Sequence, residues 1–381
     1  MSKKESPIVT FTRKLKEHKA FKDCPNKKMI YLIYFKMLIS APFRLIEGKK
    51  YKQLNTKKNY PGSNRSPVFI IGHWRSGTTY IHNLLSMDPG FIFQNKYQNF
   101  FSDNFLTTED FFKPVLSKMM NSVSPVKTWK ANVSKTMNMD TPSESDTALI
   151  SEISEFTYHW SHLFPKAWEK YFDKYLFLEN ISEKDLAEWK ETMDHLLNKV
   201  YLKNKKGRLL IKNPGDTARI NHLLELYPDA KFIFIHRNPY DVFYSNLKLW
   251  DSVLNTVALQ NISEEEKKNI VLNVYRKLHQ KYFEQKRLLK PSQLVEVSYN
   301  GIIASPLETL QQIYEQLEMP GYNQALPYFR TYIEAAMKWK KSDYNKFYED
   351  ILEINKQWNF AFNLWEYPKL DPGEYSAYIA G

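Results

Sequence analysis

Four short apolar runs divide this chain and predict the strands of a sheet. They lie at 68–71 (VFII), 208–211 (RLLI), 231–236 (KFIFIH) and 294–298 (LVEVS). A short, almost unbroken apolar run suits a strand that is covered on both faces, as in a parallel sheet. Between these runs, apolar residues recur at helical spacing, most clearly over 182–203. Strands that alternate with helices imply right-handed parallel crossovers and ligands at the carboxyl ends of the strands.

We therefore predict an α/β fold with a central parallel sheet flanked by helices. The region from about 91 to 207 has no clear buried strand and is interpreted as a helical insertion that covers the sheet. Residues 1–66 form an N-terminal basic and apolar helical arm, and residues 67–381 form the α/β domain. Within the arm, the apolar stretch 29–47 contains Lys36, Pro42 and Arg44, so it is too polar and broken to span a bilayer. We predict a helix packed on the core, and the alternative is an amphipathic helix at a membrane surface.

The loop after the first strand is a candidate phosphate site. Residues 72–79 read GHWRSGTT, and a helical apolar pattern follows them. A strand, a glycine turn and a helix N-terminus together surround an anion with free backbone N–H groups. The G-x-x-x-x-G spacing matches a Walker A loop, but Thr78 and Thr79 replace its Lys-Ser/Thr, and Arg75 supplies a cation within the loop. An ordinary ATPase or GTPase is therefore disfavoured, and a plain strand-turn-helix without ligand is the alternative.

A second candidate anion site follows the strand at 231–236. A nucleotide hydrolase would end this strand in a magnesium-binding acid, whereas here it ends in His236 and Arg237 before a helix that begins at Pro239. Ser245 lies about two helical turns further along, so its hydroxyl and the Arg237 guanidinium can meet around one phosphate. The alternative is a surface arginine and an unrelated serine.

These two segments resemble those of bacterial-type sulfotransferases, which use 3′-phosphoadenosine 5′-phosphosulfate (PAPS). Residues 72–79 resemble the family's 5′-phosphosulfate loop, and residues 235–245 resemble its 3′-phosphate motif. The resemblance implies a P-loop-like sheet and PAPS as co-substrate without a metal. It also implies a set of cofactor-binding residues, which comprises Arg75, Ser76, Gly77, Thr78, Thr79, Arg237, Ser245 and, against the adenine, Tyr299.

The resemblance also implies the catalytic residues. Lys212 resembles the family lysine that stabilises the leaving oxygen, but Pro214 stands where cytosolic members place a catalytic histidine. Residues 141–146 (TPSESD) resemble a Pro-x-Glu-x-acid motif of bacterial relatives, so Glu144 is the first choice as general base, followed by Asp216. The later candidates, in order, are Glu155, His82 and His159, and a lone histidine on an apolar helix is more often a core residue.

Composition narrows the partners and the compartment. The net charge is +12, which attracts multiply phosphorylated ligands, although it also simply favours solubility. The single cysteine, Cys24, fits a reducing compartment, and the N-terminus shows no secretory signal pattern, so we expect a cytoplasmic protein. No zinc-hydrolase motif, serine-hydrolase elbow or nucleic-acid-binding motif is present, so we expect no metal and no nucleic-acid partner.

The acceptor is the least constrained part of the interpretation. Aromatic residues make up 15% of the chain, and together with the apolar stretch 29–47 they favour the hydroxyl of a small lipophilic acceptor such as a sterol or another lipid alcohol. A glycan or a protein tyrosine is the alternative acceptor. A kinase or NTPase, and a non-catalytic nucleotide-binding protein, are the alternatives of another class. The sequence leaves the oligomeric state open, and peripheral membrane contact through 29–47 is a further expectation.

Overall fold

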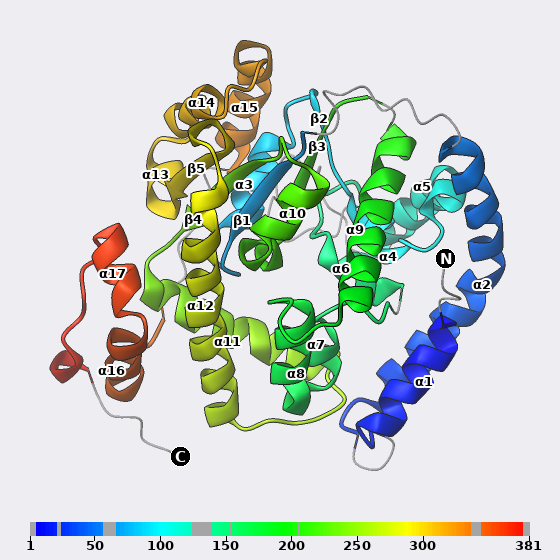
Figure 1. Cartoon of the computed structure of the whole chain (residues 1–381), viewed down its shortest axis with the longest axis horizontal. Helices are drawn as coiled ribbons and strands as arrows, with labels where there is room; N and C mark the ends of the chain where they lie inside the picture. The colour runs from blue at the N-terminus through cyan, green and yellow to red at the C-terminus, as the bar shows by residue number, and fades with distance from the viewer. Residues whose placement is uncertain are drawn as a thin grey trace.

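The centre of the molecule is a five-stranded parallel sheet (Figure 1). The computed structural model describes residues 5–20, 24–55, 66–123, 139–152, 154–204, 206–336 and 344–375. The strand order is β2-β3-β1-β4-β5. The strands are β1 (Val68–Gly72), β2 (Phe91–Ile92), β3 (Arg208–Lys212), β4 (Lys231–His236) and β5 (Leu294–Ser298). The sheet confirms the predicted α/β class and all four predicted strands.

Burial on both faces explains why the strand sequences are so apolar. Phe69 and Phe232 pack on one side of the sheet, Ile70 and Ile233 pack on the other, and none of these four side chains is exposed. In the parallel register, Ile70 lies opposite Lys212. The carboxyl ends of β1, β3, β4 and β5 therefore reach the same edge of the sheet, where the loops that follow them meet.

Helices cover both faces of the sheet. One face is covered by α3 (Thr78–Leu85), α13 (Tyr299–Ala304), α14 (Pro306–Gln316) and α15 (Tyr322–Ala336). The other is covered by α9 (Glu183–Asn204), α10 (Ile220–Leu226) and α12 (Glu264–Gln285). A third apolar cluster includes side chains of α11 (Pro239–Thr256), α16 (Tyr348–Gln357) and α17 (Asn359–Trp365). The helix predicted over 182–203 is confirmed as α9.

The region 91–207 is mainly helical where the structure describes it. Its helices before α9 are α4 (Lys96–Phe100), α5 (Phe105–Val123), α6 (Asp146–Ser151), α7 (Trp160–Leu163) and α8 (Trp168–Tyr175). One part of the prediction was wrong, because Phe91 and Ile92 form β2 and pair with Arg208 and Leu209 at the edge of the sheet. Two residues are too few to give a strand periodicity in the sequence.

The arm consists of α1 (Pro7–Glu17) and α2 (Lys27–Asn55), which lies along one side of the molecule next to α5 (Figure 1). The predicted helix over 29–47 is confirmed as part of α2, but it packs on the core with one side alone, where Ile30 and Met37 join the third apolar cluster. We expected this stretch to be too polar and broken to span a bilayer, and that expectation was wrong. Helix α2 is one helix of 29 residues that continues through Pro42, and by length and composition it could cross a membrane. The domain boundary at residues 66 and 67 stays a prediction.

Candidate functional site

The loop between β1 and α3 forms the centre of the predicted cofactor site. Gly77 caps α3 with φ 107°, a left-handed conformation that favours glycine, and no side chain among the described residues caps this helix end. A Cβ atom on Gly77 would lie 2.4 Å from Cδ2 of Tyr299, so only glycine lets the tyrosine ring pack on the loop. Thr78, which is buried, and Thr79, which is exposed, open the helix. Their backbone N–H groups belong to the first turn, whose N–H groups have no partner within the helix.

Arg75 joins the two predicted anion sites. It is exposed, it has a positive φ of 70°, and its Nε donates to Oγ of Ser245 at 2.7 Å. Arg237 in turn donates from a terminal guanidinium nitrogen to the carbonyl oxygen of Arg75 at 3.2 Å. The Arg237 guanidinium lies 4.4 Å from the ring centre of Tyr299. The structure thus brings together residues from three separate segments that the sequence assigned to one ligand.

Two details refine this site. Ser76 is buried and its hydroxyl donates to the carbonyl oxygen of His73 at 2.7 Å, so that hydroxyl holds the loop in shape in this structure. Arg237 is also buried, it pairs with Asp241 at 3.4 Å, and its Nε has no hydrogen-bond partner among the residues that the structure describes. A buried guanidinium N–H without a partner is costly, and an anionic ligand would satisfy it.

The predicted base and the predicted lysine form an ion pair beside this loop. Oε2 of Glu144 lies 2.7 Å from Nζ of Lys212, and the indole of Trp74 donates to Oε1 of Glu144 at 3.2 Å. The backbone N–H of Ser145 donates to the carbonyl oxygen of Lys212 at 3.2 Å, which fixes the chain at Glu144 against the end of β3. The Glu144 side chain is 19% exposed and that of Lys212 is 7% exposed, so the carboxylate is the more accessible partner.

Sequence reasoning missed Trp74 as a functional residue. It lies next to Arg75 in the GHWRSG loop, so the loop that holds the two anion sites also holds a partner of Glu144. The sequence signal that could have indicated Trp74 was its position inside residues 72–79, the candidate phosphate loop. The bond from Trp74 connects the predicted catalytic pair to the predicted cofactor site through adjacent residues of one loop.

The structure does not support Asp216 as a base. It lies in the 3₁₀ helix η4 (Pro214–Ala218), it is fully buried, and it accepts from Nδ2 of Asn213 at 2.8 Å. Arg219 pairs with both Asp216, at 3.3 Å, and Asp146, at 2.8 Å. Burial and the neighbouring Asp146 raise the pKa of Asp216 to about 7. The group is inaccessible to an acceptor, and together with Arg219 it joins η4 to the start of α6, two residues after Glu144.

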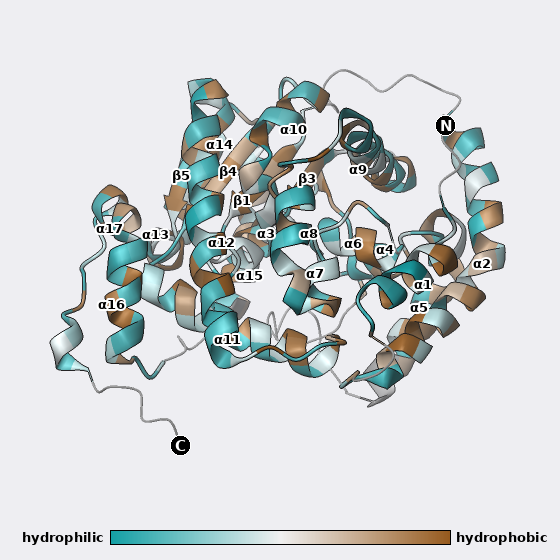
Figure 2. Ribbon diagram, turned by 60° about the horizontal axis from the view of Figure 1, so that its bottom comes forward, coloured by the Kyte–Doolittle hydropathy of each residue, from teal (hydrophilic) through white to brown (hydrophobic). Residues whose placement is uncertain are grey.

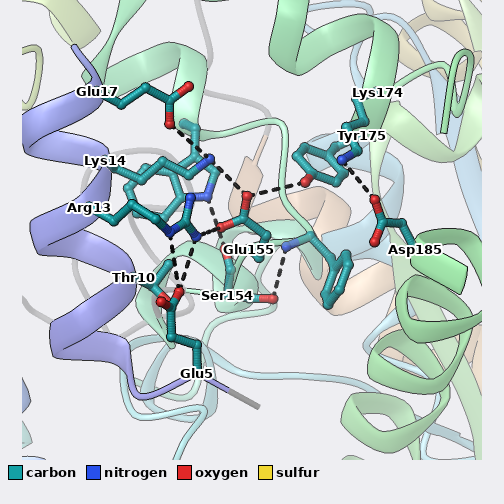
Figure 3. Close-up of polar contacts among 12 residues, drawn as sticks. Glu5, Thr10, Arg13, Lys14, Glu17, Ser154, Glu155, Lys174, Tyr175 and Asp185 are labelled. Carbon is teal, nitrogen blue, oxygen red and sulfur yellow. Dashed lines mark hydrogen bonds and ion pairs between the residues drawn. The ribbon is translucent and has the colours of Figure 1, made fainter. Parts of the chain in front are cut away.

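The remaining candidate bases also lie outside the site. Glu155 accepts from Arg13 at 2.6 Å, from Lys14 at 2.8 Å and from the Tyr175 hydroxyl at 3.3 Å, so it attaches α1 to the rest of the molecule (Figure 3). His82 and His159 are both buried in the core. Burial, with Lys212 nearby, lowers the pKa of His82 well below its ordinary value. Burial, with Arg219 nearby, lowers the pKa of His159 to about 3, so both rings are neutral at pH 7.

Comparisons with known proteins agree with this geometry. In sequence, the chain is 28% identical over 306 residues to the omega-hydroxy-beta-dihydromenaquinone-9 sulfotransferase Stf3 of Mycobacterium bovis and of Mycobacterium tuberculosis, which covers 80% of this chain and 76% of each relative. In structure, it matches sulfotransferase STF9 of Mycobacterium avium with a TM-score of 0.69 at 17% identity, over 97% of this chain and 98% of that one. Sulfotransferase STF1 of Mycobacterium tuberculosis matches with a TM-score of 0.58 at 15% identity, over 85% and 86% of the two chains. The family model "Sulfotransferase family" matches residues 67–324, and the chain therefore belongs to the sulfotransferase family.

Proposed function

We propose that this sulfotransferase moves the sulfuryl group of PAPS to the hydroxyl of a small lipophilic acceptor and releases 3′,5′-adenosine bisphosphate. The observation that carries the proposal is the contact of Arg75 with Ser245 at 2.7 Å, together with that of Arg237 with the Arg75 carbonyl at 3.2 Å. These contacts join a helix N-terminus and a buried arginine into one surface with places for two anions. A nucleotide with phosphates on both its 5′ and 3′ positions matches such a surface.

The residues present fit PAPS. The first turn of α3 and Arg75 would hold the 5′-phosphate, and the unpartnered Nε of Arg237 with Ser245 would hold the 3′-phosphate. Tyr299, which packs on Gly77 and under Arg237, offers an aromatic face for the adenine. When bound, PAPS supplies an activated sulfuryl group whose transfer is an in-line displacement.

The chain's own residues then provide the proton transfer and the charge. Glu144 accepts the proton of the acceptor hydroxyl, and its accessible carboxylate suits that role. Trp74 holds one oxygen of Glu144, which leaves the oxygen now paired with Lys212 to face the acceptor. Lys212, at the end of β3, turns from Glu144 to the leaving oxygen and stabilises the negative charge that develops there.

The lipophilic acceptor rests on two observations. The relative Stf3 is named for a menaquinone derivative, which is a hydroxylated lipid. The base also has an aromatic neighbour, because the Trp74 indole donates to Glu144 and makes an edge contact with Tyr158 at 5.7 Å between ring centres. We therefore favour a lipid alcohol, such as a sterol or a hydroxylated isoprenoid, over a glycan or a protein tyrosine.

We also propose a cytoplasmic location, for which the single cysteine is the support.

The first experiment is calorimetric binding of 3′,5′-adenosine bisphosphate, ADP and Mg-ATP to the native protein and to Arg237→Ala. We expect the native protein to prefer the bisphosphate without metal. Loss of charge-assisted hydrogen bonds to the 3′-phosphate should weaken that binding in Arg237→Ala by about 10- to 100-fold and leave ADP binding nearly unchanged. The control is Arg276→Ala, which removes an exposed arginine from α12.

Equal or tighter binding of Mg-ATP by the native protein would overturn the proposed cofactor and favour a kinase. Binding of the bisphosphate without any PAPS-dependent product from lipid alcohols, tyrosine peptides or glycans would indicate a non-catalytic nucleotide-binding protein. If the bisphosphate binds, a screen of these three acceptor classes with PAPS decides the acceptor. Turnover confined to glycans or tyrosine peptides would overturn the lipophilic assignment while leaving the cofactor assignment in place.

A further inference from the structure

The outward face of α2 carries a continuous row of exposed apolar side chains. Its members follow helical spacing and are between 51% and 75% exposed; they are Tyr31, Leu32, Phe35, Leu38, Ile39, Leu45 and Ile46. Scattered exposed hydrophobic residues are ordinary on a soluble protein, but a contiguous row along one helix marks an interaction surface. Figure 2 shows apolar segments along both α2 and the neighbouring α5.

Three charged side chains in the middle part of α2 point the other way, into the protein. Nζ of Lys36 donates to the Ser151 carbonyl at 2.6 Å. Arg44 pairs with Asp103 at 2.8 Å, and the buried Glu47 pairs with Lys199 at 2.7 Å. These three charged groups therefore face the protein while the outward face of α2 is apolar, which is the opposite of a surface helix of a water-soluble protein. These bonds hold the inward face of α2 along the surface of the protein. A helix that spans a bilayer alone would instead be surrounded by lipid on all sides.

Helix α5 widens the same surface. Phe111, Phe112, Val115 and Met119 are between 45% and 74% exposed and follow one another at helical spacing. Phe112 makes an edge contact with Phe43 of α2 at 5.7 Å between ring centres, so the two rows adjoin. We call these eleven exposed side chains, seven from α2 and four from α5, the α2/α5 face.

Charge identifies the partner. Exposed lysines stand at both ends of the row, Lys27 and Lys28 before it and Lys49 and Lys52 after it, and the chain carries a net charge of +12. An apolar row between lysines suits the boundary of a bilayer, where the apolar side chains enter the acyl region and the ammonium groups stay among anionic headgroups. We propose that the α2/α5 face docks the protein on an anionic lipid bilayer, with α2 lying in the plane of the membrane.

This docking would place the membrane on the outward side of α2, whose inward side contacts the end of α6. Lys36 bonds to Ser151, the last residue of α6, and α6 begins two residues after Glu144. A lipophilic acceptor dissolved in the bilayer would then be concentrated on the side of the molecule that carries α6 and Glu144. That last step depends on the proposed function, whereas the docking itself depends only on the α2/α5 face.

The test is sedimentation of the full chain with vesicles of phosphatidylcholine, with and without phosphatidylglycerol. We expect the native protein to sediment with the anionic vesicles and more weakly with the neutral ones. Carboxylates in the acyl region are unfavourable, so Leu38→Glu with Leu45→Glu should lower the partition coefficient by about a hundredfold. Lys28→Gln with Lys49→Gln should lower it by about tenfold, and only on anionic vesicles.

The matched control is Leu288→Glu with Leu364→Glu, which changes two leucines that are 55% and 49% exposed elsewhere on the molecule. This variant should sediment like the native protein. Calorimetric binding of the bisphosphate and thermal melting, unchanged in every variant, show that the fold and the cofactor site are intact. Failure of the docking then leaves the proposed function standing, and failure of cofactor binding leaves the docking standing.

Three outcomes would overturn the proposal. The first is a native protein that stays in solution with anionic vesicles, or a Leu38→Glu, Leu45→Glu variant that sediments equally. The second is a dimer in sedimentation equilibrium that this variant converts to a monomer, which would assign the face to a second copy of the chain. The third is retention of the native protein on vesicles in alkaline carbonate, which would indicate a spanning helix; we expect release.

Discussion

The cofactor edge of the sheet and the side that carries the arm differ in how their interacting residues are brought together, because the separation along the chain is large in both: Arg75 and Ser245 are 170 positions apart. At the cofactor edge, Arg75, Ser76 and Gly77 belong to one loop, and Arg237 and Ser245 belong to one strand-helix unit. The parallel register alone then brings the two units together. On the arm side, Glu155 bonds to Arg13 across 142 positions, and no repeating pattern joins the two segments.

The difference teaches which kinds of site a single sequence reveals. A phosphate site is built from backbone N–H groups and a few side chains in a short segment, so its residue types and spacing are constrained locally. A catalytic pair such as Glu144 and Lys212, or a face such as that of α2 and α5, depends on which segments become neighbours after folding. Substitutions at the cofactor edge should therefore change turnover and cofactor binding, whereas substitutions on the arm side should change the stability with which the arm is attached.

The largest expected effect is on turnover in Glu144→Gln. The amide cannot accept the acceptor's proton, so kcat with PAPS and a lipid alcohol should fall by about 10²- to 10⁴-fold. Bisphosphate affinity should stay near the native value, because the bond that joins Glu144 to the loop after β1 in the described structure is the one from Trp74. Steady-state kinetics and calorimetry measure the two quantities. Unchanged turnover would remove Glu144 from the mechanism, and a parallel loss of bisphosphate affinity would make it a structural support of the loop.

A smaller effect is expected at Gly77. Alanine there combines a left-handed backbone with a Cβ atom 2.4 Å from the Tyr299 ring, so Gly77→Ala should lower the free energy of unfolding by about 2–4 kcal/mol and weaken bisphosphate binding. Gly321 has a similar φ of +101° but nothing within 4 Å of the added atom, so Gly321→Ala should cost about 1 kcal/mol and leave binding unchanged. Urea unfolding and calorimetry distinguish them, and equal losses in both variants would show that Tyr299 yields to the new side chain.

The strands, and the gathering of the candidate cofactor residues at one edge of the sheet, could be predicted because their signals are contiguous. Arg237, Ser245 and Tyr299 each follow a recognisable strand, and the parallel sheet places them together. Asp216 shows the limit of this reasoning. It comes four residues after Lys212, which suggests a place at the sheet edge, but η4 turns its side chain inward to Arg219. The buried pairing of Asp216 and Asp146 with one arginine has no local signal.

The exposed face of the arm could not be predicted for a different reason. Helix α2 is apolar on both faces, so its composition indicates burial without indicating what covers each face. The fold covers one face with protein and leaves the row from Tyr31 to Ile46 exposed. Trp74 was missed because its bond to Glu144 joins positions 70 apart, which only the tertiary structure brings into contact.

The smallest expected effect concerns the attachment of the arm, at Glu155→Gln. Lys14 is 3% exposed and pairs with Glu155 at 2.8 Å, while its contact with Glu17 is 3.9 Å (Figure 3). Removal of the nearer carboxylate leaves a buried ammonium group poorly paired, but Glu155 itself is 29% exposed, so the free energy of unfolding should fall by about 1–2 kcal/mol in urea titration.

The matched control is Glu5→Gln, which breaks a pair with Arg13 in which the two side chains are 45% and 41% exposed and which should cost less than about 0.5 kcal/mol. Turnover should remain native in both variants, because neither residue contacts Trp74, Glu144 or Lys212 in the described structure. If Glu155→Gln instead lowered kcat as strongly as Glu144→Gln while stability stayed native, the carboxylate of Glu155 would have to leave Arg13 and Lys14 during turnover. Glu155 would then take part in the reaction, and the distance between the arm side and the cofactor edge in this structure would describe one conformation of the enzyme and not the one that reacts.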